Sequence, residues 1–224
     1  MKKLKLLAVG LGVIALTGSA LAIPTLIISD GIGAAVTVTD ASGVVHYSNT
    51  SFDGAWSVVI STGLTKPAQG SAANPFFDLA IQATSLTFSP THNLTITFFG
   101  TDFGPAAGSL QAIMSGHVSA GTGQPVSYNT FYSSLNAGAL TTALTASGSL
   151  APPNYNSIVT GAVIPGGLNP YSITQVVTIG GAGTGPGGSY TLDASLSGVP
   201  DGGTTVMLLG AALSGLALLR RKMA

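Results

Sequence analysis

A strict alternation of apolar and polar residues is the feature that most restricts the fold of this chain. Residues 93–99 read NLTITFF, in which Leu94, Ile96 and Phe98 alternate with polar residues. Successive side chains of a β-strand point to opposite faces, so this pattern predicts a strand with one face on a core and the other in water. Similar short segments recur through residues 23–198, and Gly, Pro, Asp and Asn turn signals separate them.

The repeated pattern predicts an all-β protein, since no segment of residues 23–198 has a convincing helical period. We expect about ten to twelve short strands in an antiparallel β-sandwich, either jelly-roll-like or Ig-like. The segment 140–150 is ambiguous, because its Ala and Leu residues also suit a helix. Residues 101–105 are expected to close the strand before them, and residues 66–75 to form a loop. The expected strands are residues 25–29, 35–39, 44–47, 56–60, 77–89 with a bend near Thr84, 93–99, 110–119, 126–133, 140–150, 155–164, 171–179 and 190–196.

The charge of residues 23–198 excludes one large class of function. This part holds six Asp, one Lys and no Glu or Arg, so six negative charges and one positive charge give a formal charge of −5. Nucleic-acid binding depends on clustered Lys and Arg, and we therefore expect no nucleic-acid partner. The whole chain has no Cys, which excludes a disulfide framework, thiol chemistry and zinc held by cysteines.

Residues 1–22 have the order of a secretory signal peptide. A basic stretch at 1–5 precedes an apolar stretch at 6–17, and Ala20 and Ala22 provide a small-x-small cleavage site. We expect a signal helix that is removed, so that the mature chain begins one residue later. An uncleaved N-terminal anchor is the alternative.

Residues 199–224 combine three parts in a fixed order. An apolar stretch without charge, residues 204–219, lies between a short polar motif and a basic cluster. A helix of this stretch rises about 24 Å, and snorkelling cations extend its reach toward the roughly 30 Å membrane core. The sequence therefore predicts a C-terminal transmembrane helix, with a buried helix in a globular core as the alternative. The motif is Val199, Pro200, Asp201, Gly202 and Gly203, and the basic stop is Arg220, Arg221 and Lys222.

The positions of the cations support the same topology. Of seven Lys and Arg residues, three lie in the leader, three lie in the last five residues, and Lys66 is the seventh. By the positive-inside rule, both ends start on the cytoplasmic side and the domain between them is translocated. We therefore expect an exported protein that is first anchored in the inner membrane and then placed at the cell surface or outside the cell.

The tail resembles the sorting signals of the PEP-CTERM class, and most closely the VPDSG-CTERM variant. The resemblance covers Val199, Pro200, Asp201, Gly203, the apolar helix and the basic stop, and it departs at Gly202, where the variant has Ser. It implies that an exosortase recognises the Pro-acidic signal after export, cuts the tail, and leaves the body released or attached at the surface. It also implies an association with extracellular polysaccharide and biofilm matrix. The resemblance is confined to the tail and the leader.

No motif in the chain has the context that a catalytic or metal site requires. Residues 183–188 contain GxGxxG, but a strand rather than a helix is expected after them, which indicates a glycine loop. His46, His92 and His117 lack metal-ligand spacing, so we expect no metal and no cofactor. The GxSxG and SxxK marks of serine hydrolases are absent from the sequence.

Four aspartates, Asp30, Asp40, Asp53 and Asp102, lie beside Gly or at expected turns. Asp at such positions accepts hydrogen bonds from backbone amides, and this is the role we expect. A Ca²⁺ site built from loop Asp residues and carbonyl oxygens is the alternative, since calcium prefers oxygen ligands.

The single Trp of the chain lies in an apolar segment. Trp56 is therefore expected in the core, and the alternative is a platform on which sugars stack. Other aromatic residues that could contribute to that platform, or simply to the core, are Tyr47, Phe76, Phe77, Phe98 and Phe99.

The leader, the tail and the lack of a catalytic motif favour one function. We expect an exported, non-enzymatic protein of the cell surface or extracellular matrix, sorted and processed by an exosortase. A carbohydrate-binding module for exopolysaccharide is the alternative. A hydrolase is the third and least favoured reading, because it needs two carboxylates, or a Ser and a His, within bonding reach across loops.

Overall fold

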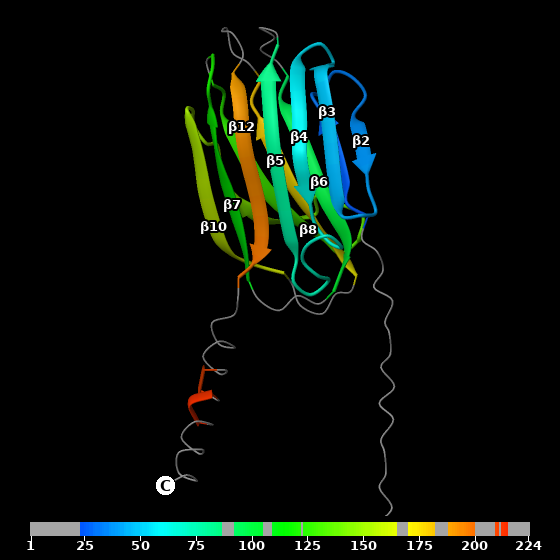
Figure 1. Cartoon of the computed structure of the whole chain (residues 1–224), viewed down its shortest axis with the longest axis vertical. Helices are drawn as coiled ribbons and strands as arrows, with labels where there is room; N and C mark the ends of the chain where they lie inside the picture. The colour runs from blue at the N-terminus through cyan, green and yellow to red at the C-terminus, as the bar shows by residue number, and fades with distance from the viewer. Residues whose placement is uncertain are drawn as a thin grey trace, which may run out of the picture.

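Twelve β-strands in two layers make up most of the described residues of the chain (Figure 1). The computed structural model describes residues 23–86, 92–104, 109–121, 123–164, 170–181, 188–199, 209–210 and 212–214. The strands are β1 (Thr25–Ser29), β2 (Val36–Thr39), β3 (Val44–Phe52), β4 (Trp56–Leu64), β5 (Phe76–Ser85), β6 (Leu94–Phe103), β7 (Ser109–Val118), β8 (Val126–Ser133), β9 (Thr142–Ala146), β10 (Asn154–Val163), β11 (Tyr171–Ile179) and β12 (Ser189–Gly198).

The strands form two six-stranded sheets in which the paired strands run antiparallel. Sheet A has the order β2-β1-β6-β11-β8-β9, and sheet B has the order β10-β7-β12-β5-β4-β3. The predicted all-β antiparallel sandwich is therefore confirmed. The blocks β6-β11-β8-β9 and β10-β7-β12-β5 have the strand order of an eight-stranded jelly roll, which is one of the two arrangements expected from the sequence. The first four strands extend it, β1 and β2 on sheet A and β3 and β4 on sheet B.

The core lies between the two sheets and is built by the alternation seen in the sequence. Leu94, Ile96 and Phe98 of β6 all point inward and are fully buried. Aromatic rings join the layers: Phe77 of β5 meets Phe98 edge-on, with ring centroids 5.7 Å apart. Because the strand period is two, this inward set leaves the intervening residues to form the outer face of each sheet.

Several element bounds differ from the expected ones. β3 and β4 continue well beyond the segments expected at 44–47 and 56–60, because their backbone ladder continues through Ser, Thr and Asn after the apolar alternation has stopped. The ambiguous segment at 140–150 contains a strand and no helix among its described residues.

The turn expected at 101–105 is also wrong in part. β6 runs on to Phe103 through an irregularity opposite Tyr171 and Ile173 of β11, where two residues of β6 face one of its partner. Asp102 lies at this irregularity with a φ of 56°, a left-handed conformation that Asp tolerates better than most residues. Asp102 therefore belongs to a β-bulge inside the strand, not to a turn after it.

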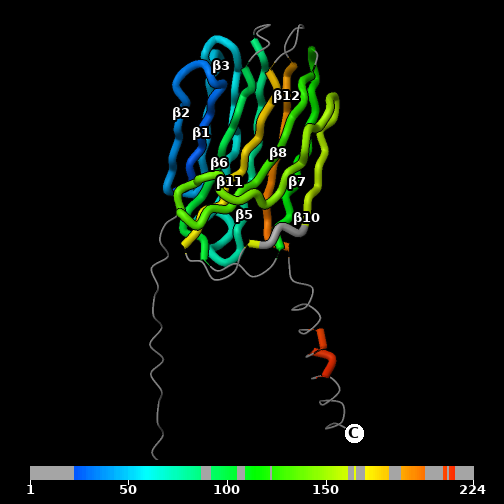
Figure 2. The backbone as a smooth tube through the Cα atoms, turned by 180° about the vertical axis from the view of Figure 1, so that it is seen from behind, coloured from blue at the N-terminus to red at the C-terminus, as the bar shows by residue number. Residues whose placement is uncertain are grey.

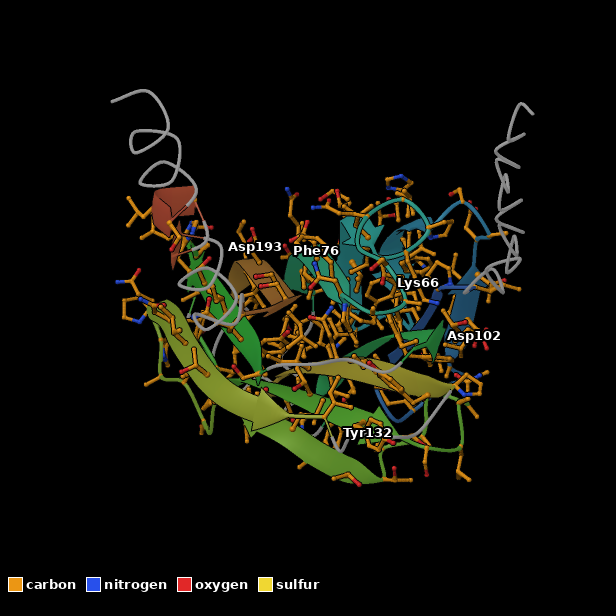
Figure 3. All side chains as sticks on the ribbon, turned by 90° about the horizontal axis from the view of Figure 1, so that it is seen from below. Lys66, Phe76, Asp102, Tyr132 and Asp193 are labelled. Carbon is orange, nitrogen blue, oxygen red and sulfur yellow. The ribbon has the colours of Figure 1, made fainter. Side chains whose placement is uncertain are left out.

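The only cation of residues 23–198, Lys66, is buried at one end of the sandwich. Its ammonium group donates to the main-chain carbonyl of Asp102 and lies 4.7 Å from the ring centroid of Phe103. Burial lowers the pKa of Lys66, and the Asp102 carboxylate acts in the opposite direction. Figure 3 shows Lys66 on the loop after β4 and Asp102 on the other sheet, so this contact ties the loop to sheet A.

The chain enters β1 and leaves β12 at the same end of the sandwich, on opposite sides of it (Figure 1). In the described part of the C-terminal tail, residues 209–210 and 212–214 are helical. No helix among the described residues has the length and apolar character needed to cross a membrane. The predicted signal peptide, most of the predicted helix at 204–219 and the basic stop lie outside the described residues.

Candidate functional site

The outer face of sheet B carries polar side chains in aligned rows. The register of β5, β12, β7 and β10 places four residues side by side in one row: Gln82, Thr191, His117 and Asn154. The next row along the strands holds Ala80, Asp193, Ser115 and Asn156. Neighbouring strands are about 4.8 Å apart, so each row crosses about 14 Å of the sheet.

These rows border a hollow of about 500 Å³, which we call the sheet B groove. Short side chains line it at Ser61, Ala80 and Ser115, and the longer side chains of Gln82 and His117 lie in the row next to that of Ala80 and Ser115. The complete lining is Ser61, Ala80, Ile81, Gln82, Ser115, Gly116, His117, Asn154, Thr191, Leu192 and Asp193. The volume falls within the range of small-molecule sites, roughly 300–1,000 Å³.

The groove offers hydrogen-bonding groups that the protein itself does not use. In the described part of the chain, the side chains of Gln82, Ser115, Asn154 and Thr191 have no hydrogen-bond partner in the protein. They provide amide and hydroxyl groups that can both donate and accept. The sequence analysis missed this set, because polar residues at alternate strand positions are ordinary and only the register shows that they share a row.

One carboxyl group of the groove lining, that of Asp193, has a second carboxyl group beside it. Asp193 contacts Asp78 of β5 through their side chains, and Figure 3 shows Asp193 on the outer side of sheet B. Burial is the largest cause that raises the pKa of Asp78, and the charge of Asp193 and the hydrogen bond with it act in the same direction. Glycosidases separate their carboxyl groups by about 5 Å or more, so two carboxyls in direct contact do not match that arrangement.

The core contains three of the six aromatic residues that could have stacked on sugars. Trp56 is 2% exposed, and its ring lies 6.3 Å from that of Tyr190 inside the sandwich. Phe77 and Phe98 are also buried, while Tyr47, Phe76 and Phe99 are partly buried. The alternative role of Trp56 in sugar stacking is therefore corrected: its inward position on β4 leaves no ring face open to a ligand.

The three histidines do not come together. His46 lies on β3 with its Nδ1 2.6 Å from the carbonyl oxygen of Ser61, His92 lies just before β6, and His117 lies in the groove. Among the described residues, no group of three or more His, Cys, Asp or Glu side chains could hold a metal ion.

The expected role holds for three of the four aspartates, and Asp53 fulfils it by accepting a hydrogen bond from the backbone amide of Gly33. Asp30 Oδ1 accepts from the amide of Ile32 at 3.0 Å, and Asp40 Oδ1 accepts from that of Ser42 at 2.7 Å, which lowers the pKa of Asp40. Asp53 lies at the turn after β3, near Asp30; burial first, and then the charge of Asp30, raises its pKa. Calcium takes six to eight oxygen ligands, and these two carboxyls can supply at most four of them.

The sorting motif begins where the folded domain ends. The Val199 amide donates to the carbonyl oxygen of Ser109 at 2.8 Å, directly after the last strand. The other motif residues, Pro200 to Gly203, lie outside the described residues, as do Ala20 and Ala22 of the leader.

The tail gives the decisive comparison with known families. Residues 198–223 match the VPDSG-CTERM motif. The chain therefore carries a C-terminal sorting tail of the PEP-CTERM type, and the resemblance drawn from the sequence is confirmed. The match to VPDSG-CTERM leaves the sandwich uncovered, and comparison with curated proteins gives no match.

Two solved structures show weak similarity to the chain. One is the structure of infectious bursal disease virus, Gx strain, with 15% identity over 79% of this chain and a TM-score of 0.31. The other is a GH31 alpha-xylosidase from Xanthomonas citri, with 7% identity over 81% of this chain and a TM-score of 0.27. The matches span 50% and 18% of those chains, respectively, and at these scores neither bears on function.

Proposed function

We propose that this VPDSG-CTERM protein is an exported, non-enzymatic β-sandwich of the cell surface or extracellular matrix. An exosortase sorts and cuts it at the tail. The match of residues 198–223 to the sorting motif is the observation that carries the proposal. The leader at residues 1–22 supplies the route of export.

The position of the motif supports cutting without damage to the fold. β12 ends at Gly198, and among the described residues of the motif Val199 donates one backbone hydrogen bond to the sandwich. A cut at the motif therefore removes none of the twelve described strands and none of the described core residues. The processed body is expected to keep the stability of the precursor.

Mass measurement of the protein recovered from its native cells tests the proposal. We expect a mature chain that starts at Ile23 and ends within residues 199–203. A double substitution, Pro200→Ala with Asp201→Asn, should leave the tail in place and keep the protein in the membrane fraction.

The matched control restores the consensus of the motif instead of breaking it. Gly202→Ser creates the VPDSG sequence and should be processed at least as completely as the natural chain. Recovery of the full-length chain, ending at Ala224, from the surface or medium would overturn exosortase processing.

The sheet B groove favours a second candidate function, the binding of a neutral, hydroxyl-rich chain such as an exopolysaccharide. Its support is the row of unpaired amide and hydroxyl side chains, with Gln82 on β5 and Asn154 on β10 at the two ends. Groups of this kind match sugar hydroxyls, which also donate and accept. Recognition would depend on hydrogen bonds, because the ring of Trp56 is buried and cannot stack on a sugar.

Binding to a panel of neutral, cationic and anionic polysaccharides tests the groove. We expect retention on a neutral polysaccharide that Gln82→Ala and Asn154→Ala each weaken several-fold without change in melting temperature. Thr97→Ala, on the outer face of sheet A, is the matched control and should bind like the natural protein. Equal weakening by all three substitutions would show that the binding does not use the groove.

A further inference from the structure

The four edge strands of the sandwich differ in how they resist pairing with another strand. β2 has four residues and β9 has five, so neither offers a long edge. β3 is long, but its register with β4 is interrupted at two places. Short strands and bulges are common means by which proteins protect an edge. Three of the four edges are therefore protected.

β10 is the exception. Its residues from Asn154 to Thr160 pair with β7 without interruption, and the single irregularity comes after them. The strand has ten residues, NYNSIVTGAV, with no charged residue and no Pro. It is the last strand of sheet B, and Figures 1 and 2 show no further strand beyond it in that sheet, although β9 of sheet A also approaches it.

The middle of this edge carries an exposed apolar side chain. Ile158 is 63% exposed, on the outer face of a strand whose neighbouring outward residues are Asn156 and Thr160. Isoleucine has a strong preference for strands and loses water-exposed apolar surface when another strand lies beside it. The unpaired edge of β10 therefore also carries an exposed apolar side chain, that of Ile158.

We propose that β10 is a self-association edge, at which a second copy of this chain adds its own β10 antiparallel across a two-fold axis. Ile158 then faces Ile158 of the second copy, and Asn156 faces Thr160. The two sheets B join into one continuous sheet of twelve strands. This proposal does not depend on export or processing.

The properties of the edge favour a second copy as the occupant. An antiparallel strand pair is compatible with two-fold symmetry, so the same residues can serve both sides. Each copy has a charge of −5 over residues 23–198, which would oppose association at most surfaces. β10 has no charge, and the nearest aspartate of sheet B, Asp193, lies two strands away. The two copies can thus meet where the repulsion is least.

Association at this edge would extend the sheet B groove. Asn154 belongs both to β10 and to the groove lining. The second copy would place its own groove beyond the two-fold axis on the same side of the joined sheet. A long polymer could then contact both grooves at once, which raises avidity without any new contact within one copy.

Site-specific cross-linking of the full chain tests the proposal, because the natural sequence has no Cys. Ile158→Cys should give a disulfide-linked dimer under mild oxidation, since facing side chains of an antiparallel pair come close enough for this bond. Ser48→Cys, exposed on the opposite edge of sheet B, is the matched control and should cross-link at least tenfold more slowly.

Sedimentation of the full chain in mild detergent gives an independent measurement. The natural protein should have twice the mass of one chain, and Ile158→Lys should reduce it to a single chain. Ile32→Lys, at a side chain that is 54% exposed in the loop after β1, should leave the dimer intact.

Three results would overturn the proposal. The first is a natural protein that stays monomeric at tens of micromolar. The second is equal cross-linking through Ser48→Cys and Ile158→Cys. The third is a mixed disulfide between copies bearing the two different substitutions, which would indicate head-to-tail extension of the sheet instead of a two-fold dimer.

Discussion

The central strands of the two sheets, β11 and β12, have opposite surroundings on their outer sides. In β11 the outward residues Ser172, Thr174 and Val176 are buried, and only Thr178 of this strand is partly exposed. In β12 the outward residues Thr191 and Asp193 are exposed. Both strands have neighbours on each side in their sheet, so strand pairing does not explain the contrast.

The difference comes from one connection, residues 134–141 between β8 and β9, which we call the strap. The Gly138 amide donates to Ser172 Oγ at 3.0 Å, and its carbonyl accepts from Thr174 Oγ1 at 3.3 Å. Asn136 holds Asp102 by two hydrogen bonds of 2.7 Å. The path of the β8–β9 connection across the outer face of sheet A is visible in Figure 2.

The contrast shows that polar side chains on an outer face can either stabilise the fold or remain available to bind another molecule. On sheet A, Ser172 and Thr174 of the outer face form hydrogen bonds with the backbone of the strap. These side chains stabilise the fold, and the strap covers them so that other molecules cannot reach them. On sheet B, side chains of the same kind remain unpaired around the groove. Ser and Thr side chains occur on both faces, and the presence or absence of the strap determines whether they are available to a ligand.

The largest expected effect comes from placing a charge at equivalent positions of the two strands. Thr174→Lys puts an ammonium under the strap and should reduce the free energy of unfolding by at least about 3 kcal/mol, since an unpaired charge would be buried. Thr191→Lys points into water and should change it by less than about 0.5 kcal/mol. Urea unfolding of both variants measures the difference. Equal losses would show that the outer face of β12 is also covered.

A smaller effect is expected from two glycines with nearly the same backbone conformation. Gly138 in the strap has a φ of 67°, and Gly148, outside it, has a φ of 68°. An added Cβ would lie 2.6 Å from the ring of Phe99 at Gly138 and would meet nothing within 4 Å at Gly148. Gly148→Ala should therefore cost only the left-handed strain, about 1 kcal/mol, and Gly138→Ala roughly 1–3 kcal/mol more.

Thermal and urea unfolding of the two glycine variants isolate the packing of the strap. The difference between them removes the backbone term, which they share. If Gly138→Ala lowers the free energy of unfolding no more than Gly148→Ala does, the strap is not packed against Phe99. Another segment would then have to account for the burial of the outer face of β11.

The strands themselves were largely predictable from the sequence, because alternation reports which residues share a face. The predicted inward set of β6, Leu94, Ile96 and Phe98, is buried as expected. The turn chemistry of Asp30 and Asp40 was also readable, since their partners lie two residues away. Strand faces and local turns depend on residues close together in the sequence, so a single sequence is enough to predict them.

The site was not predictable in the same way. Gln82, His117 and Asn154 come from three strands that are far apart in the chain, and only the jelly-roll order brings them into one row. Burial of Lys66 also runs against expectation for a lone cation, and it depends on the Asp102 carbonyl and the ring of Phe103. Contacts between distant segments leave no mark in a single sequence.

The smallest expected effect concerns the carboxyl pair on the open face of sheet B. Burial and Asp193 raise the pKa of Asp78, so the folded protein holds a proton at Asp78 more tightly than the unfolded chain does. Stability should therefore increase as pH falls from neutral through the raised pKa, until both states are protonated. Asp193→Asn removes one of the facing charges, and it should add roughly 0.2–1 kcal/mol at neutral pH and flatten this pH dependence.

Asp40→Asn provides the control of opposite sign. Hydrogen bonds from Ser42 lower the pKa of Asp40, so its contribution to stability is present above its ordinary pKa and is lost as pH falls through the lowered one. The substitution should therefore destabilise the protein at neutral pH, where Asp193→Asn stabilises it. Urea unfolding at several pH values distinguishes the two cases. A destabilising effect of Asp193→Asn at neutral pH would mean that the Asp193 carboxylate stabilises the sheet. The open face of sheet B would then contribute to the stability of the fold, just as the covered face of sheet A does.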